Sequence, residues 1–203
     1  MIDISDNQYD ALLELFNVGV GQAASSLSLI VREEVMMSVP KIELLHSQAQ
    51  KENFAIAGGQ RICAVSQHFS GPFEADTMLI FPEDKTMLIV KKMIGGVVAA
   101  QDISEMEQDA LTEIGNIVLN TCVSSLGDTF CKKFNGSTPT YRLGHRNEII
   151  DSPSTSEGVI LALHIDLFMK KDEIHGYLVF LLNVLSYEKL LENIDALLAR
   201  YST

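Results

Sequence analysis

Residues 10–17 read DALLELFN, and residues 109–116 read DALTEIGN. In each stretch an aspartate is followed after four residues by a glutamate and after seven by an asparagine, and a proline stands 23 positions beyond the asparagine. Every member of the second set lies 99 positions after its counterpart, which indicates an internal duplication. The repeated set, here called the signature, comprises Asp10, Glu14, Asn17 and Pro40 in the first copy and Asp109, Glu113, Asn116 and Pro139 in the second.

The duplication extends beyond the signature. Residues 25–27 and 124–126 both read SSL, and the pair Leu79 and Phe81 recurs as Leu178 and Phe180. Packing alone would preserve apolar periodicity, whereas this chain also repeats its polar side chains. We therefore expect two copies of one functional site.

Composition limits the classes of function. The chain has 203 residues, of which 47% are hydrophobic and 21% charged, with a net charge of -12 and a pI near 4.7. This acidity, without a basic run, argues against nucleic acid or an anionic membrane surface as the main partner. No stretch approaches the roughly 20 apolar residues that span a bilayer, and the first residues are acidic where a signal peptide would be basic. We expect a cytoplasmic protein with no membrane insertion.

Each signature lies near the start of a predicted long helix. Apolar residues recur at helical spacing over about residues 4–31 and 103–132. Ser5 with Gln8, and Ser104 with Glu107, have the spacing of a capping box at the start of each helix. The sequence then predicts strands at 36–45, 62–69, 75–81, 140–150, 158–168 and 175–182, and shorter closing helices at 83–94 and 186–199.

This order, a helix, three strands and a helix twice over, predicts an α+β fold. We expect residues 1–203 to form a single domain, with repeat one at about 1–100 and repeat two at about 101–203. The two internally duplicated units should share one core and be related by pseudo-twofold symmetry. Short turns favour antiparallel meanders within each half, although the sequence leaves the strand order open.

On an ideal helix, the signature residues form a polar ridge. Asp10, Glu14 and Asn17 fall within an arc of about 60°, directed roughly 120° away from the apolar stripe. Carboxylates accept hydrogen bonds from a cation, and an asparagine both donates and accepts them. A single such trio on a helix is usually only solvated surface. Its repetition at one offset, with the proline, favours a site.

Two glycines interrupt the first helix, Gly19 and Gly21. Each costs about 1 kcal/mol relative to alanine, so we expect a tight contact or the approach of a ligand to compensate them, with close backbone packing as the favoured reason. Their counterparts in the second half are Val118 and Asn120. Because Asn17 and Asn116 thus have different surroundings, we expect their two sites to differ in activity.

The signature resembles that of the CheC/CheX/FliY family of response-regulator phosphatases: Asp or Ser, three residues, Glu, two residues, Asn, twenty-two residues and Pro. Both halves match it in full, and the resemblance covers essentially the whole chain. The intact pair and the two closing helices look most like the stand-alone CheC type.

The resemblance implies an enzyme, a protein phosphatase that hydrolyses the aspartyl phosphate of a CheY-like receiver domain. Asn17 and Asn116 would position the attacking water, and Glu14 and Glu113 would contact the receiver's lysine, with Asp10 and Asp109 as supporting contacts. Pro40 and Pro139 would shape a strand. The protein would need no cofactor or metal of its own, because Mg²⁺ would be supplied in the receiver's acidic pocket.

A binding module is the alternative. The same fold could act as a chemotaxis adaptor with weak or absent phosphatase activity. CheC-type proteins are associated with the deamidase CheD, and CheD is a possible partner here. The exposed face of the helix at 186–199 is the candidate surface for it.

Overall fold

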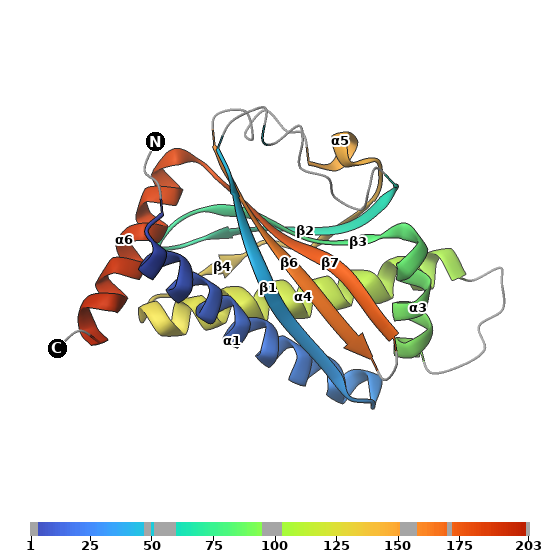
Figure 1. Ribbon diagram of the computed structural model, residues 1–203. Helices are drawn as coiled ribbons and strands as arrows, with labels where there is room; N and C mark the ends of the chain where they lie inside the picture. Colours follow the sequence, from blue (N-terminus) through green and yellow to red (C-terminus); the bar gives the residue numbers. More distant parts are fainter. Residues whose placement is uncertain are drawn as a thin grey trace.

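The computed structural model describes residues 4–46, 50, 60–94, 103–150, 158–169 and 172–201. This part of the chain forms five helices and a seven-stranded antiparallel sheet (Figure 1). The first half contains α1 Asp6–Val31, β1 Val35–Leu45, β2 Ile62–Ser70, β3 Ala75–Pro82 and α3 Glu83–Ile94. The second contains α4 Ile103–Phe130, β4 Asn135–Gly136, β5 Thr140–Gly144, α5 Arg146–Ile149, β6 Val159–Met169, β7 Asp172–Leu182 and α6 Val184–Tyr201.

The long helices α1 and α4 begin differently but end alike. Ser5 caps α1 in the predicted capping box, since its Oγ accepts from the Gln8 N–H at 3.3 Å and Gln8 Oε1 accepts from the Ser5 N–H at 2.9 Å. In the second half, α4 begins at Ile103, one residue before Ser104, and the Glu107 carboxylate accepts a hydrogen bond from Thr86 Oγ1 at 2.8 Å. The side chain of Ser104 lies outside the described residues.

Each long helix is followed by a residue in the left-handed conformation. These residues are Arg32, with φ 54°, and Cys131, with φ 55°. They are 99 positions apart, so the duplication preserves a backbone conformation that few residues other than glycine adopt.

The sheet interleaves the two halves. Its strand order is β1-β6-β7-β3-β2-β4, and β5 also pairs with β2. The expected hairpins β2–β3 and β6–β7 are present, but the expectation of a complete meander in each half is wrong. Instead, β1 of the first half pairs with β6 of the second half, and β5 of the second half pairs with β2 of the first half. The connections from β1 to β2 and from α5 to β6 are longer than a hairpin turn, so their length permits this exchange.

A pseudo-twofold axis passes through the centre of the sheet. There β3 of the first half pairs with β7 of the second, and Leu79 lies opposite Leu178. These two residues are counterparts at the offset of 99, so the central pair is formed by one position of the repeat and its own copy. The predicted symmetry and shared core are confirmed.

Helices cover one face of the sheet. Figure 1 shows α1 and α4 side by side across this face, with α3 and α6 toward opposite ends. One large apolar cluster lies between helices and sheet and includes Phe16, Val20, Val118, Leu163 and Phe180. A smaller cluster on the other face includes Ile80, Val179 and Ile149 of α5. Alternate strand residues therefore serve two cores.

The segment predicted as one strand at 140–150 differs from the expectation. The strand β5 ends at Gly144, and α5 follows at once, with Glu148 accepting a hydrogen bond from the His145 N–H at 2.8 Å. This local hydrogen bond stabilises a helical turn, and the segment therefore does not continue its pairing with β2. Among the described residues, none of the helices combines the length and apolar composition needed to cross a membrane.

Candidate functional site

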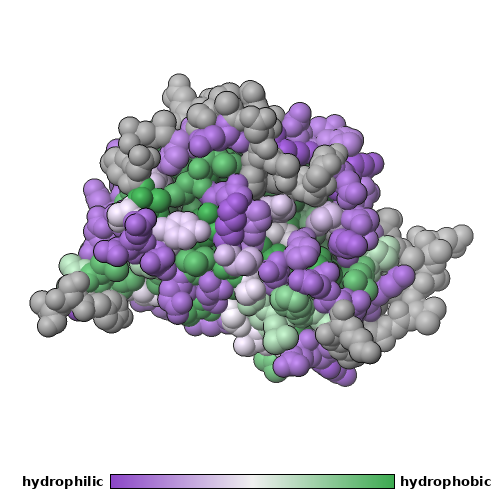
Figure 2. Space-filling model, viewed as in Figure 1, coloured by the Kyte–Doolittle hydropathy of each residue, from purple (hydrophilic) through white to green (hydrophobic). Residues whose placement is uncertain are grey.

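The signature of the first half forms an exposed ridge on α1. Asp10 and Glu14 are exposed, whereas Leu12 and Phe16 on the same helix are buried in the main core. The arrangement predicted from helical spacing is therefore present. Neither carboxylate forms an ion pair with another described residue, so both are available to a cation from outside the chain. Val18, next to Asn17 on α1, is an exposed apolar residue. Figure 2 shows apolar patches among hydrophilic residues on the side of the molecule seen in Figure 1.

Asn17 ends this ridge and is held by the strand beside it. Its Nδ2 donates to Leu13 O at 3.0 Å and to Val39 O at 3.1 Å, while its Oδ1 accepts from the Val39 N–H at 2.9 Å. Both Nδ2 hydrogens therefore have acceptors. One lone pair of Oδ1 remains for a ligand.

The second ridge lies on α4 and has the same exposure. Asp109 and Glu113 are exposed, and Leu111 and Ile114 are buried. No ion pair joins these two carboxylates to any residue that the structure describes. Asn116 is half-buried, like Asn17. The structure thus presents the six polar residues of the signature as two similar ridges.

The contacts of Asn116 differ from those of Asn17. Its Oδ1 accepts from Asn120 Nδ2 at 2.8 Å, and Asn120 Nδ2 also lies 2.7 Å from the Asn116 carbonyl oxygen and 3.1 Å from Gln67 Oε1. Gln67 in turn donates from Nε2 to Ser137 O at 2.6 Å. Within the described part of the chain, nothing accepts a hydrogen bond from Asn116 Nδ2. Its donor edge is free.

The two prolines occupy matching breaks in the sheet. Pro40 lies where the pairing of β1 with β6 shifts register, between Ser38 and Lys41. Pro139 lies in the gap between β4 and β5, at the corresponding positions of the second half. Proline has no N–H to donate to a ladder, which is why it is found at such irregularities. This placement agrees with the structural role predicted for both prolines.

These breaks explain the fixed distance from asparagine to proline. In the first half, the backbone of Val39, directly before Pro40, holds the Asn17 carboxamide. In the second half, the carbonyl of Ser137, two residues before Pro139, holds Gln67 and through it Asn120. The break next to each proline thus anchors the signature asparagine, directly in one half and indirectly in the other.

Sequence reasoning did not identify Gln67 and Asn120 as members of the site. Two signals were present. Asn120 replaces Gly21 at the offset of 99, and Gln67 occupies an alternate position of β2 together with the apolar residues Cys63, Val65 and Phe69. Gln67 is only 5% exposed, so its amide must find partners inside the protein.

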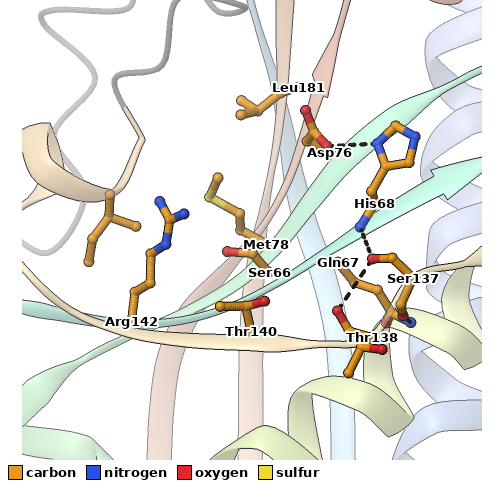
Figure 3. A pocket seen from close by; sticks show the side chains of 11 residues that line it. Ser66, Gln67, His68, Asp76, Met78, Ser137, Thr138, Thr140, Arg142 and Leu181 are labelled. Atoms are coloured by element: carbon orange, nitrogen blue, oxygen red, sulfur yellow. Dashed lines mark hydrogen bonds and ion pairs between the residues drawn. The ribbon is translucent and has the colours of Figure 1, made fainter.

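A polar cavity of about 320 Å³ opens beside this hydrogen-bond chain (Figure 3). Gln67 and Ser137 lie at one end, next to His68, whose Nδ1 is 2.8 Å from Asp76 Oδ1, and Arg142 lies at the other end. None of the six polar signature residues lines this cavity. Its lining comprises Ser66, Gln67, His68, Asp76, Met78, Ser137, Thr138, Thr140, Arg142, Ile149 and Leu181.

Within the described ranges, one group of side chains could hold a metal ion by geometry. Ligand atoms of Asp166, Glu173 and His175 lie within 4.8 Å of one another on the β6–β7 hairpin. The His175 ring already pairs with Asp166 at 2.7 Å, and the group lies on neither signature helix. It is therefore separate from the signature.

No family model matches the chain. Among curated proteins, the flagellar motor switch phosphatase FliY of Bacillus subtilis is 23% identical over 143 residues, which is 70% of this chain but only 37% of FliY. The CheY-P phosphatase CheC of the same species is 25% identical over 160 residues, covering 77% of this chain and 74% of CheC. The chain thus spans little more than a third of one relative's length and most of the other's.

Solved structures share the fold at low identity. FliY of Thermotoga maritima superposes with a TM-score of 0.78 at 18% identity, over 96% of this chain and 99% of FliY. The FliM middle domain of H. pylori gives 0.61 at 9% identity, over 94% and 99% of the two chains. A CheX–CheY–BeF3–Mg²⁺ complex of Borrelia burgdorferi gives 0.55 at 18% identity, over 83% and 98%.

Three findings point to the same group of proteins. They are the two curated relatives, the shared fold and the two full copies of the signature. The duplicated sheet, with its helices on one face, is the architecture of FliY and of the FliM middle domain. The relatives found by sequence carry the names FliY and CheC. These similarities in sequence and fold support the resemblance of the chain to the CheC/CheX/FliY family.

Proposed function

We propose that this protein hydrolyses the aspartyl phosphate of a CheY-like receiver domain. The observation that carries the proposal is the pair of ridges, in which exposed carboxylates that form no ion pair with a described residue lie one and two turns before a half-buried asparagine. Both curated relatives have phosphatase in their names, and one neighbour in fold was solved as a CheX–CheY–BeF3–Mg²⁺ complex.

The carboxylates dock the receiver. Glu14 or Glu113 accepts hydrogen bonds from the ammonium group of the receiver's active-site lysine, and a charge-assisted bond of this kind is among the stronger ones available. Asp10 or Asp109, one turn earlier, extends the contact. The net charge of -12 attracts a cationic group on approach.

The asparagine holds the nucleophile. Asn17 or Asn116 binds a water in line with the bond between phosphorus and the aspartyl oxygen. The water oxygen bonds to phosphorus as the bond to the aspartyl oxygen breaks. The aspartate leaves as a carboxylate, and the water's proton leaves with inorganic phosphate. An asparagine is a poor base and a poor nucleophile, so the reaction proceeds by positioning and without a covalent enzyme intermediate.

The receiver supplies the remaining chemistry. Its own acidic pocket holds the Mg²⁺ that neutralises the phosphoryl oxygens. We place the protein in the cytoplasm with its substrate. Within the family we place it nearest the stand-alone CheC type, since both halves keep a full signature and a closing helix, α3 or α6.

The test is the decay of a phosphorylated CheY-like protein with wild-type and variant protein. We expect acceleration by the wild type and a loss of about 10²-fold in Asn17→Ala/Asn116→Ala, the size typical of removing a preorganised contact to the reacting groups. The exchange Glu14→Lys/Glu113→Lys should lose the activity as well, and it leaves the Asn17 contacts to Val39 intact. Asn147→Ala, an exposed asparagine on α5, is the matched control and should retain full activity.

Equal rates for the wild type and both double variants, all shown to be folded by circular dichroism, would refute a phosphatase that uses these residues. Separate single-turnover measurements with each receiver domain of the same organism identify the substrate.

A chemotaxis adaptor is the second candidate. Val184 and Leu185, at the start of α6, are 53% and 58% exposed, so an apolar surface adjoins the predicted CheD contact. Under this proposal, Leu185→Asp weakens binding to CheD while Asn17→Ala/Asn116→Ala does not. Unchanged CheD affinity in Leu185→Asp would exclude this surface.

A further inference from the structure

The carboxamide of Asn116 is held by a chain of side chains that the repeated signature does not contain. Asn120 lies one turn later on α4, and Gln67 reaches it from β2 across the interface between helix and sheet. The chain ends at the carbonyl of Ser137, beside the break that contains Pro139. It is absent from the first half, because the counterpart of Asn120 is Gly21.

Backbone carbonyls determine which way each amide in this chain points. Ser137 O can only accept, so the Gln67 atom 2.6 Å away must be Nε2, and Gln67 Oε1 therefore faces Asn120. Asn120 directs Nδ2 at the carbonyl of Asn116, 2.7 Å away, which likewise can only accept. The Asn116 atom that faces Asn120 Nδ2 at 2.8 Å must then be its oxygen.

The result is a defined orientation of Asn116. Its Oδ1 keeps one lone pair for a water, and its Nδ2 donates to no acceptor among the described residues. A water bound there meets an acceptor and a donor at fixed positions. Because the Asn116 side chain is already ordered before the receiver binds, ordering it does not add to the entropic cost of the reaction.

We propose that Asn120, itself held by Gln67, is the positioning residue that orients Asn116 for catalysis. The inference rests on the proposed phosphatase function and adds a residue that the repeated signature lacks. The first half has no need of it, because the backbone of Val39 holds Asn17 directly.

The experiment isolates the second site by blocking the first. Glu14→Lys reverses an exposed charge on α1 and leaves the contacts of Asn17 in place. In this background, Asn120→Ala should lower kcat about tenfold, the value expected for losing a hydrogen bond of about 1.4 kcal/mol. The KM for the phosphorylated receiver should stay unchanged, since Asp109 and Glu113 are untouched.

Two comparisons separate positioning from a general structural effect. Asn120→Asp has the same shape, but a carboxylate cannot donate to Asn116 Oδ1, so kcat should fall at least as far as in Asn120→Ala. In the Glu113→Lys background only the first site is active. Adding Asn120→Ala there should therefore leave the rate of receiver dephosphorylation unchanged.

Thermal unfolding and binding to a beryllofluoride-treated receiver establish that each variant is folded and docks. An unchanged kcat for both Asn120 variants in the Glu14→Lys background would overturn the inference while leaving the phosphatase function standing. Equal losses in both backgrounds would overturn it in favour of a structural role. No activity in the wild type would overturn the proposed function, and this inference with it.

Discussion

At the scale of single residues, the two signature asparagines share a position in the repeat but differ in their free atoms. Both Nδ2 hydrogens of Asn17 are used by the carbonyls of Leu13 and Val39. Among the residues that the structure describes, the Asn116 carboxamide bonds only to Asn120, through one lone pair of its oxygen. To donate to a water or a phosphoryl oxygen, Asn17 must first give up a hydrogen bond, whereas Asn116 need not.

This difference predicts unequal sites, with the second more active. Breaking a hydrogen bond costs about 1 kcal/mol, or roughly fivefold in rate. We expect Asn116→Ala to retain about a fifth of the wild-type kcat or less, and Asn17→Ala to retain most of it. Single-turnover decay of the phosphorylated receiver measures both. A larger loss in Asn17→Ala, at unchanged thermal stability, would contradict the ranking.

At the scale of elements, glycines set how closely α4 can approach its neighbours. A Cβ on Gly19 would lie 3.1 Å from Cys122 Cα, so the expected close packing of α1 is confirmed there. At Gly21 the favoured packing explanation is wrong, because a Cβ would meet nothing within 4 Å, and the alternative of a ligand approach stays a prediction. On α4, a Cβ on Gly115 would overlap the side chain of Val65 on β2. That contact fixes the distance from α4 to the sheet.

Two glycine-to-alanine changes should therefore have opposite effects on stability. Gly115→Ala should lower the free energy of unfolding by about 1–3 kcal/mol, because the added methyl group overpacks the interface with β2. Gly21→Ala should raise it by about 0.5–1 kcal/mol, since the position is helical and has room. Urea denaturation followed by circular dichroism measures both. Equal effects of the two changes would show that the packing of α4 on β2 is not tight.

At the scale of the whole molecule, neither half contains a complete sheet. The strand β1 pairs with β6 of the second half, and β2 pairs with β5 of that half. The main core likewise includes Phe16 and Leu79 from one half and Leu126 and Phe180 from the other. Because β1 and β5 each pair with a strand of the other half, the helices that carry the two copies of the signature pack on one shared sheet and core.

Separation of the halves should therefore abolish the folded monomer. Residues 1–100 alone leave β1 without its partner and expose one edge of β3, and such edges pair with other chains. We expect aggregation or a swapped dimer from either half, and a folded complex when both are expressed together. Size-exclusion chromatography and circular dichroism decide the matter. A cooperatively unfolding monomer of residues 1–100 would contradict the shared core.

The sequence by itself determined the repeat, the long helices, most strands and the exposed ridges. These features depend on local periodicity, on capping at Ser5 and on an offset that can be read along the chain. Only the tertiary structure decided the exchange of β1 and β5 between halves, because pairing partners distant in sequence leave no local pattern. It alone also decided the different anchoring of Asn17 and Asn116, since Val39, Gln67 and Ser137 reach these side chains only after the sheet is assembled.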